Sequence, residues 1–160
     1  MDLWRLVPRE RADSAFSGEG ARRFGGRWNP PGTSAVYLAE HLSLAALEIL
    51  VHLPRAALSK PYLAFRVTVP DGIAAEDWAP EQLPEGWDRE PPADASQQAG
   101  AEWLARGSGL LLAVPSVIVP QERNFLVNRA HADWERLTIH SPEPFSFDHR
   151  LTASGEEREP

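Results

Sequence analysis

Short apolar runs, most of them bounded by glycine or proline, divide the chain into strands and helices. In the run over residues 3–7, Arg5 lies on the face opposite Trp4 and Leu6, which is the alternation of a strand. Similar apolar and β-branched runs predict strands over residues 35–39, 62–69, 110–119, 134–140 and 145–147. We expect the 110–119 strand to be central, with an interruption at Pro115, and the 145–147 strand to lie at an edge.

Two segments carry helical patterns. Residues 41–53 are almost entirely apolar and end before Pro54. A second helix is predicted from Asp94, as its N-cap, to Arg106, with glycines at 107 and 109 to end it. Polar, glycine-rich or proline-rich stretches predict loops over residues 17–32, 71–93 and 124–129, and we expect few functional groups in 71–93.

These elements, which show no internal repeat, predict an α+β fold. We expect a single compact domain over residues 1–151, with a mixed or mainly antiparallel sheet and flanking helices, followed by a disordered tail over residues 152–160. A chain of 160 residues with 42% hydrophobic composition is sufficient for one core.

The charge distribution sets one basic region against an acidic remainder. A net charge of −7 argues against a basic surface that tracks nucleic acid. Residues 1–28 nevertheless hold six arginines against four acidic residues, whereas residues 71–110 hold nine acidic residues against two arginines. This asymmetry favours a small anionic ligand in the basic region and a basic protein partner on the acidic side, although an acidic face is most often simply solvated.

The composition also bears on chemistry and compartment. The chain has no cysteine, which excludes disulfides, thiolate nucleophiles and cysteine-bound zinc. It has no apolar run of the ~18 residues that span a membrane, and its start lacks the features of a signal peptide. We therefore expect a cytoplasmic protein without membrane contact.

The loop over residues 17–32 is suited to holding an anion. It places Arg22, Arg23 and Arg27 among five glycines. Glycine lets the backbone approach a ligand closely, and guanidinium groups donate to phosphate oxygens in a planar fork. The alternative is a solvated turn with surface arginines. Neither a Walker loop nor a GxGxxG motif is present, so a phosphate site here would differ from both.

The helix over residues 41–53 carries the candidate for catalysis. At about 100° per residue, His41, Glu48 and His52 fall within about 40° of one another on an otherwise mostly apolar helix. Glu48 is therefore expected to be partly desolvated, which is costly for an ionised carboxylate unless it is paired or hydrogen-bonded. A position at the solvent edge of the helix is the alternative.

Two other kinds of site fit the sequence less well. The stripe of His41, Glu48 and His52 does not follow the His-Glu-x-x-His zinc pattern and no further cluster supplies ligands, so we expect no metal and a structural role for His52. Ser108 follows a helix and precedes a strand, which is the reverse of the turn that presents a hydrolase serine.

The chain thus offers arginines, the aromatic hydroxyl of Tyr37 and the semi-buried carboxylate of Glu48. Together these groups suit the cleavage of a bond between a sugar carbon and a cationic leaving group, as in NAD⁺. Breaking the nicotinamide–ribose bond builds oxocarbenium character, which a nearby carboxylate stabilises. Nicotinamide leaves without being protonated, so one carboxylate is sufficient.

Several blocks of the sequence together resemble the RES-domain toxin family. The blocks are Gly18 to Pro30, Val36 to Ala39, Leu47 to Leu53, Val114 to Ser116 and Asn124 to Asn128, and they span about residues 3–140. The resemblance implies a RES domain over residues 1–151, a fold like that of ADP-ribosyltransferases, and action on NAD⁺ as a substrate, with no cofactor.

The resemblance implies that Glu48, Tyr37 and Arg27 carry the reaction. Glu48 would lie beside the anomeric carbon and stabilise the transition state, and Tyr37 would stack on or orient nicotinamide. Arg27 would hold the pyrophosphate or the ribose. For Tyr37, a place in the core is the structural alternative.

Five further residues are implied to contact the substrate: Arg5, Trp28, Ser116, Asn124 and Asn128. Arg5 would hold the pyrophosphate or ribose, and Ser116 would hydrogen-bond the ribose or nicotinamide. The alternatives are an ion pair for Arg5, a backbone contact at a bulge for Ser116, and loop capping for the two asparagines.

By resemblance, the chain is expected to be the toxin of a bacterial type II toxin–antitoxin system that depletes NAD⁺ by hydrolysis or phosphorolysis and arrests growth. An ADP-ribosyltransferase that modifies a cellular protein is one alternative, and a non-catalytic phosphate- or nucleotide-binding module is an alternative of another class. The implied partner is an antitoxin with a helix-turn-helix domain that blocks the active site, so that DNA is contacted only through it. A dimer, or a hetero-oligomer with the antitoxin, is expected.

Overall fold

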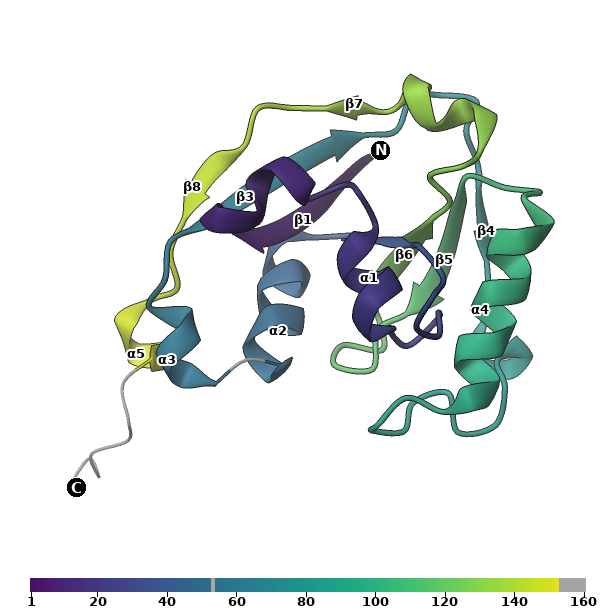
Figure 1. Ribbon diagram of the computed structural model, residues 1–160, viewed down its shortest axis with the longest axis horizontal. Coiled ribbons are helices and arrows are strands. Elements are labelled where there is room, and N and C mark those ends of the chain that lie inside the picture. The colour runs from purple at the N-terminus through teal and green to yellow at the C-terminus, as the bar shows by residue number, and fades with distance from the viewer. Residues whose placement is uncertain (53, 153–160) are drawn as a thin grey trace.

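The computed structural model describes residues 1–52 and 54–152, whose strands form one eight-stranded mixed sheet (Figure 1). The strands are β1 (Asp2–Pro8), β2 (Val36–Ala39), β3 (Tyr62–Thr68), β4 (Ala75–Asp77), β5 (Leu111–Pro115), β6 (Arg123–Val127), β7 (Thr138–Ile139) and β8 (Glu143–Phe145). The helices are α1 (Glu19–Phe24), α2 (Leu42–His52), α3 (Arg55–Leu58), α4 (Asp94–Arg106) and α5 (His149–Thr152), with 3-10 turns η1 (Arg9–Ser14), η2 (Pro80–Gln82) and η3 (Ala132–Arg136). The predicted α+β class is confirmed.

The strands follow the order β4-β5-β6-β2-β1-β3-β7, and β8 also pairs with β3. Within the described residues, β4 and β5 are the one parallel pair, so the sheet is mixed but mainly antiparallel, as predicted. The longest helices, α2 and α4, have 11 and 13 residues. No helix in the described part of the chain combines the length and hydrophobicity needed to cross a lipid bilayer.

The sheet nearly divides between β1 and β2. β1 pairs with β3 along seven residues and β2 pairs with β6 along four, but β1 meets β2 at one residue pair, Trp4 and Ala39. We call β1, β3, β7 and β8 the first lobe and β2, β6, β5 and β4 the second lobe (upper left and right of Figure 1). At the division, Nη1 of Arg5 donates to the carbonyl oxygen of Tyr37 at 2.6 Å. This side chain takes a place that a backbone N–H holds in a continuous sheet.

The main core lies where the two lobes curl toward each other. Leu3 and Val67 of the first lobe share one cluster with Val36, Leu111 and Phe125 of the second, and each is at most 5% exposed. Because so few strand contacts cross the division, burial of this shared apolar cluster holds the lobes together.

Helices α2 and α4 cover the outer face of the sheet on either side of the division. α2 buries Leu44 and Ala45 against β1, β2 and β3. α4 buries Trp103 against Leu112 and Leu126 of the second lobe. Residues of β1 and β2 between the two helices form the floor of the site described below.

Residues 71–93 are not the simple extended loop that their prolines predict. They contain β4 and η2, and the rings of Trp78 and Trp87 lie 5.8 and 6.2 Å from that of Trp28. The carboxylate of Glu76 accepts hydrogen bonds of 2.9 Å from the indoles of Trp78 and of Trp103 in α4. Aromatic burial thus fixes the segment on the second lobe and outweighs its local preference.

The prediction of a loop over residues 124–129 was wrong, because residues 124–127 belong to β6. Phe125 and Val127 face the core between the lobes, whereas Asn124 and Leu126 face the opposite side. The alternation of a strand is therefore present, and burial between β2 and β5 on both faces stabilises it.

The single strand predicted over residues 134–140 was also wrong. η3 occupies its first part and leaves only β7 extended. The ring of His131 accepts a hydrogen bond from the N–H of Asp133 at 3.1 Å, and Asp133 pairs with Arg136 at 3.0 Å, so local side-chain contacts favour the turn over the strand. The predicted edge strand at 145–147 begins earlier, as β8.

A few boundaries also differ from those predicted. β5 ends at Pro115 and lies beside the edge strand β4 rather than at the centre of the sheet. Ala93 is the N-cap of α4, so Asp94 lies in the first turn, where its charge favours the positive end of the helix dipole. α5 includes Thr152, and the rest of the predicted tail, residues 153–160, lies outside the described residues.

Gly100 lies where α4 packs against the loop that carries Trp28. An added Cβ would lie 2.7 Å from the Cβ of Trp28 and closer still to its carbonyl oxygen. We predict that Gly100→Ala lowers the free energy of unfolding by about 1–3 kcal/mol, the usual cost of forcing atoms into a packed interior. Urea unfolding followed by tryptophan fluorescence measures this change.

Gly20→Ala is the matched control for that variant. No heavy atom lies within 4 Å of a Cβ added at Gly20, which is in α1, and alanine favours a helix by roughly 0.5–1 kcal/mol. Equal unfolding midpoints for Gly100→Ala and the wild-type protein would contradict the close packing of α4.

Candidate active site

A cavity of about 800 Å³ opens over the division between the lobes. Its floor comes from β1 and β2, one wall from α2, and the other wall from parts of segments 24–28 and 90–97. Six of the eight predicted site residues line it: Arg5, Arg27, Trp28, Tyr37, Glu48 and Asn124. Its volume is within the range of roughly 300–1,000 Å³ usual for ligand sites.

Glu48 lies on the α2 wall and is held by two neutral donors. Its Oε1 accepts hydrogen bonds from Nδ2 of Asn124 at 2.5 Å and from Oγ of Ser116 at 3.1 Å. No donor among the described residues bonds to Oε2. The carboxylate is therefore fixed in orientation by groups that carry no opposite charge, and Oε2 is the oxygen that a ligand can reach.

Ser116 is fully buried and does not line the cavity. Its Oγ accepts hydrogen bonds from the N–H groups of Ile118 and Val119 at 3.0 and 3.2 Å, so the hydroxyl proton is left for Glu48. The structure therefore does not bring Ser116 to the cavity, and its contact with the ribose or nicotinamide stays a prediction. In the structure the residue orients Glu48, and the turn after β5 is folded around the same oxygen.

Tyr37 forms part of the floor, but its hydroxyl is committed to the preceding loop. The hydroxyl donates to Oδ1 of Asn29 at 2.7 Å and accepts from the N–H of Trp28 at 3.1 Å. Burial raises the pKa of Tyr37 well above its usual value of 10, so the phenol is protonated at neutral pH. Tyr37 can present its ring to a ligand, but it is not placed to act as an acid or base.

Asn29, which the sequence analysis did not single out, organises this loop. It is fully buried, and its Nδ2 lies 2.9 Å from the carbonyl oxygens of Ala21 and Thr33 and 3.2 Å from that of Pro30. Because Oδ1 also holds Tyr37, one amide joins the loop to β2. Its place between tryptophan and proline was a visible signal for a turn-forming asparagine.

Arg5 is a desolvated cation that forms no ion pair with any described residue. Its Nη1 bonds to the Tyr37 carbonyl, and its Nε is buried without a hydrogen-bond partner. Burial lowers the pKa of Arg5 to about 10, which leaves the guanidinium charged at neutral pH. A cation in this state at a cavity is a candidate for binding an anionic ligand.

Arg27 faces the cavity from the opposite wall with most of its donors in use. Nη1 donates to the carbonyl oxygens of Trp87 and Arg89 at 2.8 and 2.7 Å, and Nη2 pairs with Oε2 of Glu90 at 3.2 Å. Trp28, predicted as a substrate contact, is 2% exposed and stacks on Trp87. Both residues therefore hold the neighbouring segment in place as well as lining the cavity.

Asn128 lies away from the cavity, in the turn after β6. Its Nδ2 donates to the carbonyl oxygen of Leu104 at 3.2 Å, and its Oδ1 accepts from the N–H of Ala130 at 3.1 Å. These hydrogen bonds are those of the loop-capping alternative, and a contact of Asn128 with substrate stays a prediction.

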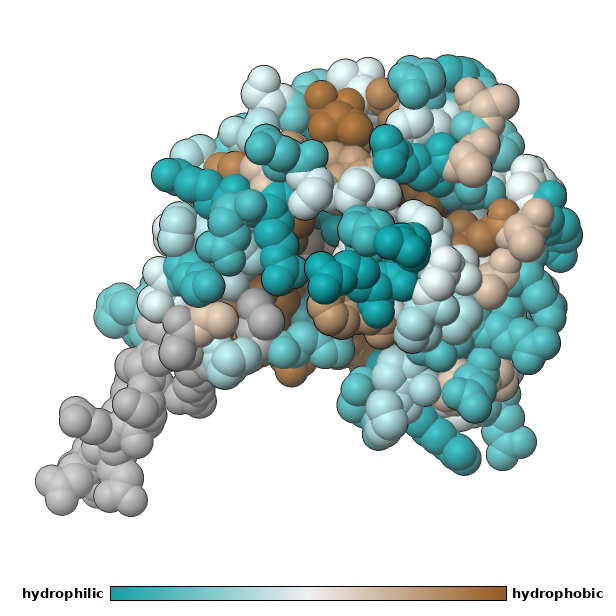
Figure 2. All heavy atoms as spheres, in the orientation of Figure 1, coloured by the Kyte–Doolittle hydropathy of each residue, from teal (hydrophilic) through white to brown (hydrophobic). Residues whose placement is uncertain are grey.

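α1 forms inside the predicted basic loop and turns two of its arginines outward. Arg22 pairs with Glu19 through hydrogen bonds of 2.8 and 2.7 Å, and Arg23 lies over the ring of Phe24. Neither arginine lines the cavity. Figure 2 shows the hydrophilic side chains gathered over α1. Only Arg27 of the three remains at the site, which disfavours a binding module built on all three.

The predicted stripe of histidines and Glu48 does not act as one group. His41 precedes α2 and lies 3.4 Å from Glu122, outside the cavity, whereas Glu48 and His52 line it. In residues 1–52 and 54–152, no three His, Asp or Glu side chains gather closely enough to hold a metal ion.

Sequence reasoning missed three charged or amide side chains of the lining, those of Arg11, Glu90 and Gln97. Gln97 donates from Nε2 to the carbonyl oxygen of Gly26 at 2.9 Å and so joins α4 to the 24–28 segment of the same wall. The lining holds three arginines against two glutamates and is therefore net positive. No local pattern marks these residues, because their part in the site depends on how η1 and α4 pack.

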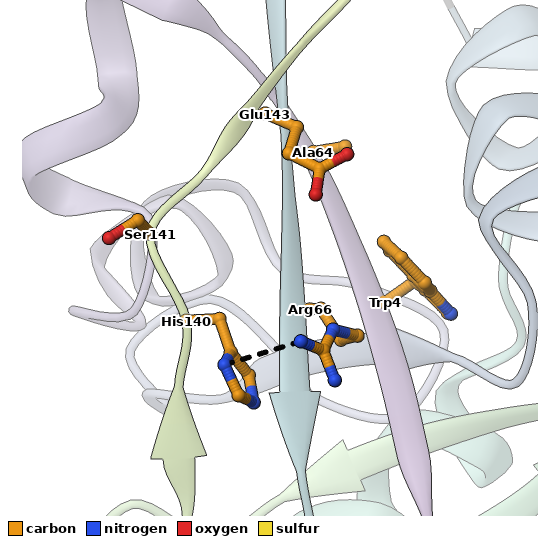
Figure 3. Close-up of a pocket in the computed structure, with 6 residues that line it drawn as sticks. All are labelled: Trp4, Ala64, Arg66, His140, Ser141 and Glu143. Carbon is orange, nitrogen blue, oxygen red and sulfur yellow. Dashed lines mark hydrogen bonds between the residues drawn. The ribbon is translucent and has the colours of Figure 1, made fainter.

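A second cavity, of about 270 Å³, lies on the first lobe (Figure 3). It is lined by Trp4, Ala64, Arg66, His140, Ser141 and Glu143, and contains none of the predicted site residues. Arg66 pairs with Asp2 at 3.2 Å and lies 3.4 Å from His140, so these groups fasten strands β1 and β3 to the segment after β7.

The sequence profile of the RES domain family matches residues 2–148, and the chain belongs to this family. It is 37% identical over 156 residues to Toxin Res of Yersinia enterocolitica, which covers 94% of this chain and 99% of the relative. It is 39% identical over 153 residues to the Prs ADP-ribosylating toxin of a Sphingobium species, which covers 93% of this chain and 95% of the relative.

Two comparisons point to a mycobacterial protein. A stretch of 36 residues, 22% of this chain and 19% of the relative, is 58% identical to the NAD(+) phosphorylase MbcT of Mycobacterium tuberculosis. The crystal structure of the M. tuberculosis MbcT-MbcA toxin-antitoxin complex aligns with a TM-score of 0.73 and 25% identity, covering 91% of this chain and 84% of that chain. The fold expected from the family resemblance is thereby confirmed.

The buried phenol of Tyr37 predicts a loss of stability at alkaline pH. Its pKa is raised in the folded protein, so the unfolded state loses this proton first as pH rises above about 10. The stabilisation is therefore complete below that pH and declines above it. Urea unfolding between pH 8 and about 11 should show a shallower decline for Tyr37→Phe than for the wild-type protein.

Tyr62 is the other of the two tyrosines and supplies the control, because its pKa is raised as well, first by burial and then by Glu10. Tyr62→Phe should remove only the part of the decline that Tyr62 itself causes and retain the part that Tyr37 causes. Identical slopes for Tyr37→Phe and the wild-type protein would show that the Tyr37 phenol is not buried as described.

Proposed function

We propose that this chain is the toxin of a bacterial type II toxin–antitoxin system and that it cleaves the nicotinamide–ribose bond of NAD⁺. The arrangement at Glu48 carries the proposal: neutral donors fix one carboxylate oxygen, and the residue lines a cavity that also holds three arginines. The relatives named as toxins support the role as a toxin, and the relative named as an NAD(+) phosphorylase supports NAD⁺ as the substrate.

In this proposal the pyrophosphate of NAD⁺ binds to the cavity arginines. Arg5 supplies a desolvated charge without a carboxylate partner, and Arg11 supplies an exposed one at η1 that forms no ion pair with any described residue. Planar guanidinium groups match the geometry of phosphate oxygens. This placement leaves the nicotinamide ribose to Glu48.

Glu48 stabilises the positive charge that develops on the ribose as nicotinamide departs. Its free Oε2 accepts a hydrogen bond from a ribose hydroxyl, and its charge acts on the oxocarbenium-like transition state without having to reorient. Nicotinamide leaves as a neutral molecule, so no general acid is required. The commitment of the Tyr37 hydroxyl to Asn29 is consistent with such a mechanism.

The group that accepts the ADP-ribose divides the proposal into two candidates. Water or inorganic phosphate as acceptor depletes NAD⁺, and the likeness to the NAD(+) phosphorylase MbcT supports this candidate. A protein side chain as acceptor gives ADP-ribosylation, which the likeness to the Prs ADP-ribosylating toxin supports.

We also propose that a cognate antitoxin covers the mouth of the cavity, through a region attached to a helix-turn-helix domain, in a hetero-oligomer. Phe24, Val51 and Val117 line the cavity and are 72%, 56% and 36% exposed, an unusual degree for large apolar side chains. The structural likeness to a toxin–antitoxin complex supports a partner of this kind.

Glu48→Gln tests the chemical step. The substitution removes the charge but keeps the size of the side chain and an oxygen for Asn124 and Ser116. We predict a fall in kcat for nicotinamide release of about 10²–10⁴-fold, with KM changed by only a few-fold, because charge stabilisation is lost in the transition state. Nicotinamide is measured by chromatography in buffer alone, with inorganic phosphate, and with cell lysate, which also identifies the acceptor.

Glu102→Gln is the matched control, since this exposed carboxylate on α4 accepts its one described hydrogen bond from Gln98. It should turn over NAD⁺ as the wild-type protein does. Equal turnover by Glu48→Gln would remove Glu48 from the mechanism. Absence of nicotinamide release by the wild-type protein under all three conditions would favour the non-catalytic binding module.

The proposed antitoxin surface is tested with Phe24→Asp. A charge on this exposed ring should weaken the complex with the product of the adjoining antitoxin gene by tenfold or more, as is usual for apolar contacts at the centre of an interface. Binding is measured by surface plasmon resonance. Ile139→Asp on β7 is the control, because Ile139 is 40% exposed and lies outside the cavity. Equal affinity for both variants would contradict the placement of the partner.

A further inference from the structure

Arg27 contacts two chemically different kinds of acceptor on residues 84–93, which we call the wall segment. Two of its three hydrogen bonds run from Nη1 to backbone carbonyl oxygens, those of Trp87 and Arg89. The third runs from Nη2 to the carboxylate of Glu90. The carbonyl groups are neutral, so they orient the guanidinium without cancelling its charge, whereas the carboxylate does cancel it.

The carbonyl contacts belong to a rigid part of the wall segment. Consecutive turns are closed by hydrogen bonds from the Trp87 N–H to the Pro84 carbonyl and from the Arg89 N–H to the Gly86 carbonyl, both at 3.1 Å. Gly86 has a φ of 75°, which favours glycine. The ring of Trp87 also stacks on the buried ring of Trp28. These contacts keep the two carbonyl oxygens aimed at Arg27 whether or not Glu90 takes part.

Of the three hydrogen bonds of Arg27, the one to Glu90 is the one that a ligand can replace. The Glu90 side chain is 66% exposed, whereas that of Arg27 is 17% exposed, and the N–O distance of 3.2 Å is the longest of the three. Both residues line the cavity. An exposed carboxylate on a flexible side chain gains little from such a pair, so a ligand with a higher charge density can replace it.

We propose that the Glu90 carboxylate occupies the position on Arg27 that a phosphate oxygen of the substrate takes, so that Glu90 is an internal competing anion that sets the affinity of the site. The ligand displaces Glu90 into solvent, while the two carbonyl contacts keep Arg27 in place. This inference rests on the proposed function for the identity of the substrate as NAD⁺, but the exchange itself requires only a phosphate ligand.

Inorganic pyrophosphate is the probe, because its binding does not depend on turnover. Isothermal titration calorimetry on the full chain should give a Kd about two- to fivefold lower for Glu90→Gln and for Glu90→Ala than for the wild-type protein. Glu85→Gln removes the same charge from the wall segment without contacting a cavity arginine among the described residues, and it should bind as the wild-type protein does. KM for NAD⁺ should also be lower for the two Glu90 variants than for Glu85→Gln and the wild-type protein.

A double-mutant cycle separates competition at Arg27 from a general change in charge. In the background of Arg27→Gln, Glu90→Gln should give no further gain in pyrophosphate affinity, because the guanidinium for which Glu90 and pyrophosphate compete is gone. A purely structural role for Glu90 predicts the opposite order, with weaker binding and altered tryptophan emission from a loosened wall segment.

Equal or weaker pyrophosphate binding by Glu90→Gln would overturn the inference, and so would an equal gain in Glu85→Gln or a gain that persists without Arg27. Tighter pyrophosphate binding by Glu90→Gln, with no nicotinamide release from any variant, would support the inference while the proposed function fails. The two ideas are therefore tested separately.

Discussion

The division of the sheet between β1 and β2 is the constraint on which the rest of the structure depends. With a single residue pair joining these strands, the lobes are held together by a shared apolar core and by the bond from Arg5 to the Tyr37 carbonyl. A continuous ladder would close this part of the sheet with backbone hydrogen bonds. The division instead brings a charged group to the floor of a cavity, and the placement of α2 and α4 on either side supplies the walls.

The motif from Gly26 to Pro30 owes its pattern to packing as much as to ligand binding. A Cβ at Gly26 would lie 2.8 Å from the Tyr37 hydroxyl, so only glycine lets that hydroxyl reach Asn29 and the backbone of Trp28. The buried ring of Trp28 packs against Trp78 and Trp87 of residues 71–93, and Asn29 closes the loop. The segment from Gly26 to Pro30 has the composition of an anion-binding loop, but much of it serves to fix one wall of the cavity.

The cavity charges share one physical feature: neutral groups orient them. Hydroxyl and amide donors hold Glu48, one backbone carbonyl holds Arg5, and two backbone carbonyls hold Arg27. A charge oriented in this way is available to a ligand, whereas a charge neutralised by an opposite partner is not. Glu90 is the exception, since it is a full counter-charge at the cavity wall. Such orientation before binding is the arrangement expected of a site that stabilises developing charge.

The sequence by itself determined the family, the α+β class and the elements with strong local patterns, such as α2 and its one acidic residue, Glu48. It misassigned residues 124–129 and 134–140, and it undervalued 71–93, because polar and proline-rich composition there is outweighed by burial against distant parts of the chain. Only the tertiary structure decided which groups hold the site residues in place: Asn124 reaches Glu48 across 76 residues of chain, and Trp87 reaches Arg27 across 60. Periodicity records which side of an element is buried, but not which distant side chain meets it, because that contact is fixed only when the separate elements pack together.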